Sequence, residues 1–215
     1  MRRVVLATAN EHKVHELRQI LRDLVEELDL EIVSTADFED LPDVAETEVT
    51  FVGNATLKAR AIAEATGLPA LADDSGLTVD VLGGSPGIFS ARWSGSRAGA
   101  DASRPAKDRA NLELLLEQLA DVPDEHRGGA FACAAVIALP DGRTAYSVGE
   151  VRGRIARAPK GTNGFGYDPI FVPDDQPGGE QRHLAEYTDA EKNAISHRGR
   201  AFRALIPAIR ELLAS

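Results

Sequence analysis

The chain has 215 residues, of which 43% are hydrophobic and 27% charged, so it can bury a sizeable core as a globular protein. Its formal net charge of −10 argues against a function on nucleic-acid polymers, which are bound through clustered Lys and Arg side chains. The opening residues, MRRVVLATAN, hold too short an apolar run for a signal peptide or a membrane span, which predicts a cytoplasmic protein without a membrane partner.

Hydrophobic periodicity and stop signals predict alternating strands and helices in the first half of the chain. We expect strands at residues 4–7, 31–34, 70–72 and 77–81, and helices at 13–24 and 50–67. Thr50 is the expected N-cap of the second helix, and Gly67 supplies its stop. The acidic residues 73–76, DDSG, are expected to form a turn between the third and fourth strands.

The second half predicts a helix at 107–119, a hairpin of 130–139 and 143–152, a glycine-rich loop, and a closing helix at 200–213. Cys133 lies in an apolar strand of this hairpin, and a single cysteine excludes an internal disulfide. Strands and helices interleave without a strict βαβ rhythm. This pattern predicts one domain over residues 1–215, an α/β fold with a mixed twisted sheet, flanking helices and two lobes around a central cleft.

Residues 6–13, LATANEHK, pass from a strand that ends in small residues into the start of a helix. Free backbone N–H groups, the positive end of the helix dipole and the Lys13 ammonium would meet there, which suits a phosphate. The segment is neither a Walker A loop nor a GxGxxG turn. Taken alone, it more often means that Thr8 or Asn10 caps the helix and that Lys13 is solvated.

Asn54 and Lys58 are four residues apart and share one face of the helix expected after Thr50. A solvated Lys58 is the simpler interpretation of this spacing. The acidic residues 46–48 just upstream are also ambiguous, because glutamates before a helix complement its dipole.

Asp73, Asp74 and Ser75 stand between two apolar strand segments. Two adjacent carboxylates in a tight turn are suited to hold a hard divalent cation and polarise a water molecule. Ordinary turn chemistry is the alternative. The apolar sequence on both sides favours a pair of acids that faces a cleft and has perturbed pKa values.

Residues 160–171, KGTNGFGYDPIF, combine three glycines with Phe165 and Tyr167. Glycine lets the backbone approach a ligand closely, and an aromatic ring on such a loop can stack on a base. A hairpin connection with core aromatics is the alternative interpretation.

Residues 191–199, EKNAISHRG, place Lys192, His197 and Arg198 close together just before the last helix. Such side chains usually face solvent. Their donors could also read a carbonyl oxygen on a base and neutralise phosphate.

Five blocks together resemble the inosine triphosphate pyrophosphatase family, the Ham1-like pyrophosphatases of non-canonical purine nucleotides. The blocks follow one another in the family's order: LATANEHKVHEL, TFVGNATLKARAIA, ADDSGLTVDVLGGSPGIFSARWSG, GTNGFGYDPIF and EKNAISHRG. The resemblance implies a homodimer that hydrolyses ITP, dITP and XTP between the α and β phosphates with Mg²⁺. It implies a two-lobed mixed α/β fold with the substrate in the cleft.

The resemblance also implies site residues by position. The triphosphate would be bound by Lys58, which would also be catalytic, and by Thr8, Ala9, Asn10, Glu11, His12 and Lys13. Asn54 and Ser75 would contact the substrate. The nucleoside would be bound by Phe165, Gly166, Tyr167, Asp168, Lys192, His197 and Arg198. Asp74 would be the general base beside Asp73 and would share the metal with Glu46. Donors from His197 or Arg198 and from the backbone of the glycine loop would select a purine 6-oxo group against ATP.

Two positions depart from the family pattern: Gly53 stands where Glu is common, and Trp93 where Tyr is usual. The first departure shifts the expected metal ligand to Glu46. A Maf-like pyrophosphatase acting on dTTP or UTP is the nearest enzymatic alternative. A nucleotide-binding module without turnover is the alternative from another class, and it would be expected to lack one of the acids Asp73, Asp74 and Glu46.

Overall fold

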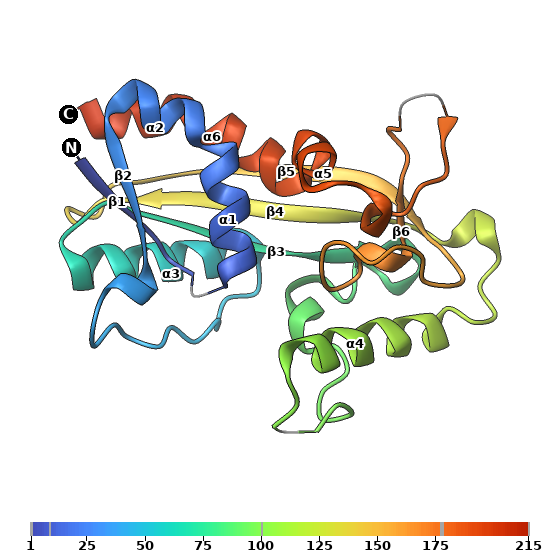
Figure 1. Ribbon diagram of the computed structural model, residues 1–215. Helices are drawn as coiled ribbons and strands as arrows, with labels where there is room; N and C mark the ends of the chain where they lie inside the picture. The colour runs from blue at the N-terminus through green and yellow to red at the C-terminus, as the bar shows by residue number, and fades with distance from the viewer. Residues whose placement is uncertain (1, 9, 100, 177–178, 215) are drawn as a thin grey trace. The chain divides into compact units, whose positions relative to one another are not determined.

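The computed structural model describes residues 2–8, 10–99, 101–176 and 179–214, without the side chain of His12. It has a mixed α/β fold, as the sequence predicts, with a six-stranded sheet in the order β2-β1-β3-β4-β5-β6 (Figure 1). The strands are β1 (Arg2–Leu6), β2 (Leu30–Ser34), β3 (Ala70–Val79), β4 (Gly128–Ala138), β5 (Thr144–Ile155) and β6 (Phe171–Pro173). The α-helices are α1 (Glu11–Ile20), α2 (Arg22–Leu28), α3 (Phe51–Thr66), α4 (Arg104–Gln118), α5 (Asp189–Ile195) and α6 (His197–Ala214).

The chain divides into two compact units, each built from segments that are distant in sequence. Unit 1 comprises residues 1–74, 133–149 and 197–215, and unit 2 comprises 75–132 and 150–196. The division falls within β3, β4 and β5, so each of these strands contributes residues to both units.

Unit 1 is a three-layer arrangement, because its strands bury side chains on both faces. Successive residues of β1 enter different cores: Val4 and Leu6 pack with α1, α2 and α6, whereas Val5 packs with α3. β4 alternates in the same way. In Figure 1, α3 accordingly lies on one face of the sheet, and α1, α2 and α6 lie on the other. β1 pairs in parallel with both β2 and β3, and its carboxyl end leads into α1.

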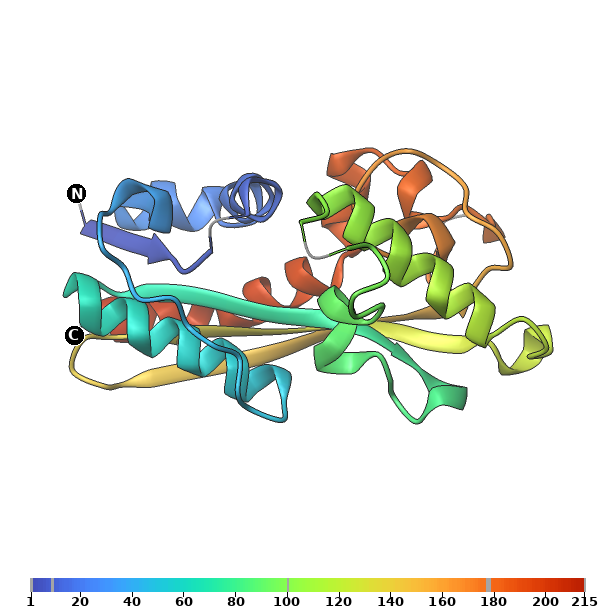
Figure 2. The same cartoon turned by 90° about the horizontal axis from the view of Figure 1, so that it is seen from below.

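Unit 2 has a separate core beneath α4. Leu112, Leu115 and Leu119 pack there against the ends of β3 and β5 and against the aromatic rings of Phe131 and Phe171. Figure 2, which views the chain from below, shows α4 with the short helical turns beside it. β6 pairs antiparallel with β5 at residues 153–155.

Most of the predicted elements are confirmed, with shifted ends. Thr50 caps α3 by accepting the Gly53 N–H at 3.0 Å, and Gly67 ends the helix with φ of 65°. The helix expected at 13–24 is divided into α1 and α2 at Leu21. The hairpin of β4 and β5 is present and longer than predicted.

The acidic turn expected at residues 73–76 is wrong. These residues continue one strand, β3, from Ala70 to Val79. Asp73 and Asp74 tolerate a strand interior because cationic and amide side chains of α1, α3 and α6 surround them. Those partners are distant in sequence, so local composition indicated a turn instead.

α5 was not predicted. A capping box begins it: the Thr188 hydroxyl accepts the Glu191 N–H at 3.3 Å, and the Glu191 carboxylate accepts the Thr188 N–H at 2.8 Å. Lys192 therefore lies on α5, whereas His197 and Arg198 begin α6.

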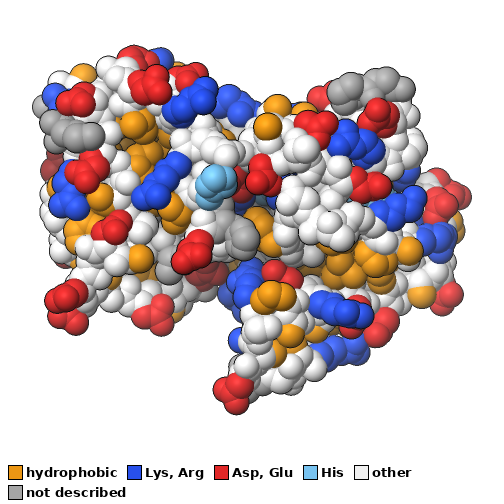
Figure 3. All heavy atoms as spheres, in the orientation of Figure 1, with side chains coloured by type: hydrophobic (Ala, Val, Ile, Leu, Met, Phe, Trp, Pro, Cys, Tyr) orange, Lys and Arg blue, Asp and Glu red, His pale blue; other side chains and the backbone are white. Residues whose placement is uncertain are grey.

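Within the described residues, no helix is long and apolar enough to cross a membrane. On the face drawn in Figure 3, Lys and Arg side chains are interspersed with Asp and Glu side chains.

Candidate active site

The start of α1 places Lys13 beside the acids of β3. The Asn10 side chain accepts the backbone N–H of Lys13 at 3.4 Å, and the Thr8 hydroxyl accepts the backbone N–H of Asn10 at 3.2 Å. These local contacts shape the entry to the helix. The Lys13 ammonium then lies 3.0 Å from Asp73 Oδ2, within unit 1.

Asp73 is a buried carboxylate surrounded by positive charge. Besides Lys13, the Nε and Nη2 atoms of Arg198 each lie 3.2 Å from Asp73 Oδ2. Burial alone would raise the pKa of Asp73, but the charges of Lys13, Arg198 and Lys58 outweigh it and hold that pKa well below the ordinary range. Asp73 is therefore a permanent anion and a poor proton acceptor.

Asp74 has the opposite environment. Asn54, which is fully buried on α3, donates to Asp74 Oδ2 at 3.1 Å, and the Lys58 ammonium lies 3.7 Å from Asp74 Oδ1. Burial is the largest influence and raises the pKa of Asp74, and the nearby charge of Glu46 raises it further. Of the two acids, Asp74 is the better proton acceptor.

Lys58 is shared between two carboxylates. Its ammonium lies 2.9 Å from Glu46 Oε1, on the segment before α3, and it also faces Asp74. Burial by itself would lower the pKa of Lys58, but the carboxylates of Asp74, Asp73 and Glu46 raise it overall. The predicted association of Asn54 and Lys58 on one helix face is thus present, and both side chains reach Asp74.

Glu46 and Asp74 have the chemistry of a magnesium site. Both are oxygen ligands that converge on one cation, the Lys58 ammonium, and the charge of Glu46 disfavours ionisation of Asp74. Mg²⁺ is usually held by one or two carboxylates together with substrate phosphates. Among the described residues no group of three or more His, Cys, Asp or Glu side chains could hold a metal ion.

Unit 2 carries a second polar cluster, in the glycine-rich loop. The buried Asp168 carboxylate accepts the Phe165 N–H at 2.8 Å and the Lys192 ammonium at 2.7 Å, both at Oδ2. The same ammonium lies 4.8 Å from the centroid of the Phe165 ring, a cation–π contact. Lys192 of α5 therefore fixes both the acid and the aromatic ring of the loop.

Two glycines make this loop possible. A Cβ atom on Gly164, which has φ of 80°, would lie 2.1 Å from Asp168 Oδ2, and a Cβ on Gly161 would lie 2.2 Å from the Ala185 carbonyl oxygen. Ala185 accepts the N–H groups of Thr162 and Asn163. A side chain at either position would clash with these atoms, so glycine is what allows the loop to pack this closely against them.

Tyr167 does not share the exposure of Phe165. Its ring belongs to the core of unit 2, and its hydroxyl donates to the Ser90 carbonyl at 2.9 Å. Burial raises the pKa of Tyr167. The side chain of Phe165, which is half-buried, is the better placed of the two to meet a base.

Arg198 is buried, whereas an arginine at the start of a helix usually faces solvent. Its guanidinium is buried between Asp73 and Glu16, with Nη1 2.5 Å from Glu16 Oε2. These carboxylates raise the pKa of Arg198 against the effect of burial. Arg198 thus neutralises two acids of unit 1, and a role of this side chain in reading the base stays a prediction.

The remaining predicted residues are described only in part. Ser75 follows the acids on β3, and His197 is buried in the first turn of α6. Glu11 is exposed in the first turn of α1. Ala9 and the side chain of His12 lie outside the described residues.

Glu16 was not predicted. It lies on α1 at the third position after Lys13, so both residues face the same side of that helix. The i, i+3 spacing was visible in the sequence, but it acquires meaning only with Arg198, which is 182 residues away.

Comparisons with known proteins point to one family along nearly the whole chain. The model of the Ham1 family matches residues 4–208. The chain belongs to the Ham1 family. It is 58% identical to a dITP/XTP pyrophosphatase of Streptomyces coelicolor, covering 99% of this chain and all of that one. A dITP/XTP pyrophosphatase of Frankia alni is 54% identical over 99% of this chain and all of its own length.

Solved structures of the Ham1 family support the fold. A HAM1 protein of Coxiella burnetii has a TM-score of 0.82 at 41% identity, and the match covers 98% of this chain and all of that one. A nucleoside-triphosphatase or dITP/XTP pyrophosphatase of Mycobacterium abscessus has a TM-score of 0.73 at 45% identity, covering 97% of this chain and all of that one.

The two departures from the Ham1 pattern have local explanations. A Cβ atom on Gly53 would lie 2.6 Å from the Cβ of Glu48, so this turn of α3 has no room for a side chain. Trp93 donates from Nε1 to the Gln118 side chain at 2.8 Å, at the end of α4.

Proposed function

We propose that the protein is a Mg²⁺-dependent pyrophosphatase that hydrolyses dITP, XTP and ITP to the monophosphate and pyrophosphate. The observation that carries the proposal is the contrast between Asp73 and Asp74 on one strand of unit 1. Asp73 is held as an anion by Lys13 and Arg198, whereas Asp74 has a raised pKa and lies between Asn54 and Lys58. The names of the full-length relatives supply the substrate class.

The residues of unit 1 bind and activate the phosphates. Lys13 and Lys58 neutralise the triphosphate, and the backbone N–H groups at the start of α1 add dipole stabilisation. Glu46 and Asp74 would hold Mg²⁺, which when bound offsets the charge of the phosphate oxygens. Positioning and charge neutralisation of this kind account for most catalysis of phosphoryl transfer.

Asp74 is the proposed proton acceptor. As a water oxygen bonds to the α phosphorus, one water proton moves to an Asp74 oxygen, and the bond from the α phosphorus to the bridging oxygen breaks to release pyrophosphate. Asn54 orients Asp74 through its 3.1 Å hydrogen bond. Asp73 keeps Lys13 in place through their 3.0 Å ion pair.

The glycine loop of unit 2 is the proposed nucleoside site. Phe165 offers a ring for stacking, and Lys192 fixes that ring together with Asp168. The Phe165 N–H is already bonded to Asp168, but within the described residues the N–H groups of Gly166 and Tyr167 have no acceptor. We assign these two donors to the purine 6-oxo group, because the 6-amino group of adenine would leave them unpaired.

The reaction can be followed directly by ³¹P NMR on dITP with Mg²⁺. We expect pyrophosphate and dIMP as the products, whereas orthophosphate and dIDP would contradict cleavage between the α and β phosphates. Asp74→Asn should lower kcat by a factor of about 10² or more, the usual effect of losing a general base. A variant that keeps a tenth of the wild-type kcat would remove Asp74 from that role.

We also propose that the protein is a homodimer of the cytoplasm, where its nucleotide substrates are found. The basis is the resemblance to its family, and analytical ultracentrifugation at micromolar concentration tests it. One species with twice the chain mass of 23.0 kDa is expected, and a monomer over the whole concentration range would contradict it.

A further inference from the structure

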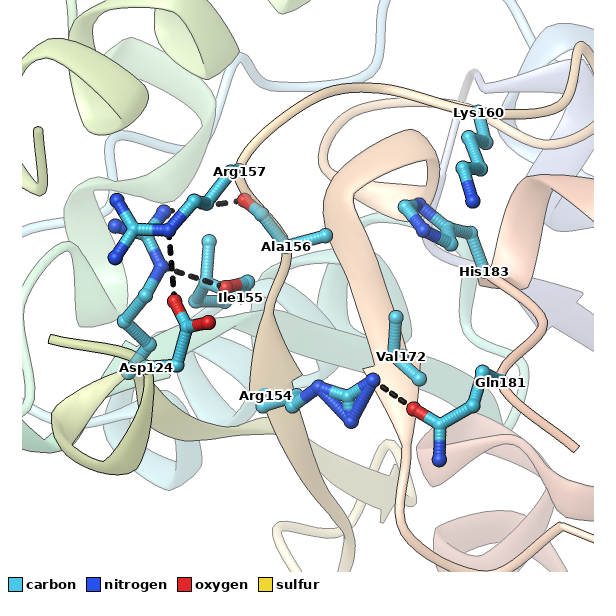
Figure 4. Close-up of a pocket in the computed structure, with 10 residues that line it drawn as sticks. Asp124, Arg154, Ile155, Ala156, Arg157, Lys160, Val172, Gln181 and His183 are labelled. Carbon is cyan, nitrogen blue, oxygen red and sulfur yellow. Dashed lines mark hydrogen bonds and ion pairs between the residues drawn. The ribbon is translucent and has the colours of Figure 1, made fainter. Parts of the chain in front are cut away.

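Unit 2 contains a small basic cavity whose lining includes only Lys160, the first residue, from the glycine loop of residues 160–171. The cavity has a volume of about 210 Å³ and is lined by Arg127, Arg154, Arg157, Lys160, His183 and one acid, Asp124. Figure 4 shows these side chains around it, with Lys160 next to His183, Arg154 next to Gln181, and Arg157 next to Asp124. Four permanent cations against one carboxylate leave a surplus of three positive charges, in a chain whose net charge is −10.

The internal contacts do not neutralise this surplus. Among the described residues, Arg157 is the one cation of the cavity that has an acidic partner, Asp124 Oδ1 at 2.7 Å. Arg127 donates to the carbonyl oxygens of Leu119, Ile155 and Ala156, and Arg154 donates to the neutral side chain of Gln181. The Lys160 ammonium has no hydrogen-bond or ion-pair partner within the described part of the chain.

Two of these arginines have a structural role. Arg127 and Arg157 donate to the carbonyl oxygens of Leu119, Ala120 and Val122, which follow the last turn of α4. Arg127 is buried, and burial and then the charge of Arg157 lower its pKa. A bound anion would offset the repulsion between the Arg127 and Arg157 guanidinium groups. Because backbone carbonyls hold both side chains in place, the two residues supply a fixed positive field rather than flexible ligand contacts.

The ligand contacts fall to Lys160, Arg154 and His183. Lys160 is exposed and Arg154 is half-buried, so both ends can reorient toward a ligand. His183 is buried, and its Nδ1 lies 2.6 Å from the Pro169 carbonyl oxygen, which places the proton on Nδ1.

We propose that this cavity binds a compact, multiply charged phosphate anion, namely pyrophosphate or orthophosphate. Three surplus charges match such an anion better than a single carboxylate. Among the residues described, no Phe, Tyr or Trp side chain lines the cavity, which favours a phosphate anion over a nucleobase as the ligand. Apart from Lys160, at the start of the glycine loop, the cavity shares no residue with the proposed active site, and the proposal does not depend on the proposed function.

The test uses isotope-labelled full-length protein without Mg²⁺, titrated with sodium pyrophosphate and, separately, with sodium orthophosphate. Amide shifts in ¹H–¹⁵N spectra are followed at residues 154–160 and 181–183. Saturable shifts there, retained in Lys13→Ala, are expected for the proposed site. Shifts confined to residues 8–13 and 54–58 would overturn it and would leave the proposed function intact. The anion with the lower Kd identifies the ligand.

Charge-removing variants supply the matched comparison. Lys160→Gln and Arg154→Gln should each weaken the Kd read from residues 154–160 by about tenfold, which corresponds to about 1.4 kcal/mol. Arg152→Gln removes the same charge from the same strand, but Arg152 pairs with Asp80 and does not line the cavity. An equal loss in Arg152→Gln, or wild-type affinity in the first two variants, would contradict a built site.

Discussion

At the scale of single residues, Asp73 and Asp74 are neighbours with different tasks. Asp73 compensates two cations, the partly exposed Lys13 and the buried Arg198, whereas Lys58 near Asp74 keeps Glu46 as a second partner. Asp73→Asn should therefore destabilise the fold by about 3–5 kcal/mol, the usual result of breaking a buried charge network. Asp74→Asn should cost much less. Thermal unfolding of the two variants measures this difference in stability. Equal unfolding midpoints would contradict the claim that Asp73 carries the buried charge network and Asp74 does not.

Arg198 gives a prediction about selectivity. Because its guanidinium pairs with Asp73 and Glu16, Arg198→Ala should lower kcat/KM for ITP and for ATP by similar factors. The ratio of kcat/KM for ITP to kcat/KM for ATP should change by less than about threefold, a difference of about 0.7 kcal/mol. Steady-state kinetics on both substrates measures it. A selective loss on ITP would restore Arg198 as a reader of the base.

At the scale of elements, the glycine loop depends on a close approach that only glycine allows. Gly164→Ala would place a methyl group against Asp168 and disturb its bonds to Phe165 and Lys192. We expect KM for dITP to rise by about tenfold, equivalent to about 1.4 kcal/mol of lost binding. Gly142→Ala is the control, since Gly142, in the turn between β4 and β5, also has positive φ but no atom within 4 Å of a Cβ. If both variants raise KM equally, backbone strain alone explains the loss.

The elements that the sequence predicted best are those specified by nearby residues. The helix of residues 51–66 carries its own cap at Thr50 and its own stop at Gly67. The capping box of α5, Thr188 with Glu191, was equally local and could have been found. The continuous strand through Asp73 and Asp74 could not, because its stability depends on Lys13, Asn54 and Arg198 from three helices.

At the scale of the whole molecule, the sequence indicated which segments form the candidate site but not which of their charged side chains form ion pairs. The blocks around Lys13, Lys58 and Asp74 do meet in unit 1. The pairing of Arg198 with Glu16 was invisible, because a buried arginine and a solvated arginine have the same local sequence signal. Burial and long-range charge decide such pairings, and both are properties of the folded chain.

Pyrophosphate release across a panel of triphosphates tests the central claim most directly. The panel contains dITP, XTP, ITP, dGTP, dATP and dTTP, each with Mg²⁺ at the same concentration. The N–H groups of Gly166 and Tyr167, which have no acceptor within the described residues, should favour a 6-oxo purine over adenine by a factor of about 10² or more in kcat/KM. The predicted result is rapid turnover of dITP, XTP and ITP with slow turnover of dATP and dTTP. Equal rates on all six, or a preference for dTTP, would contradict the account.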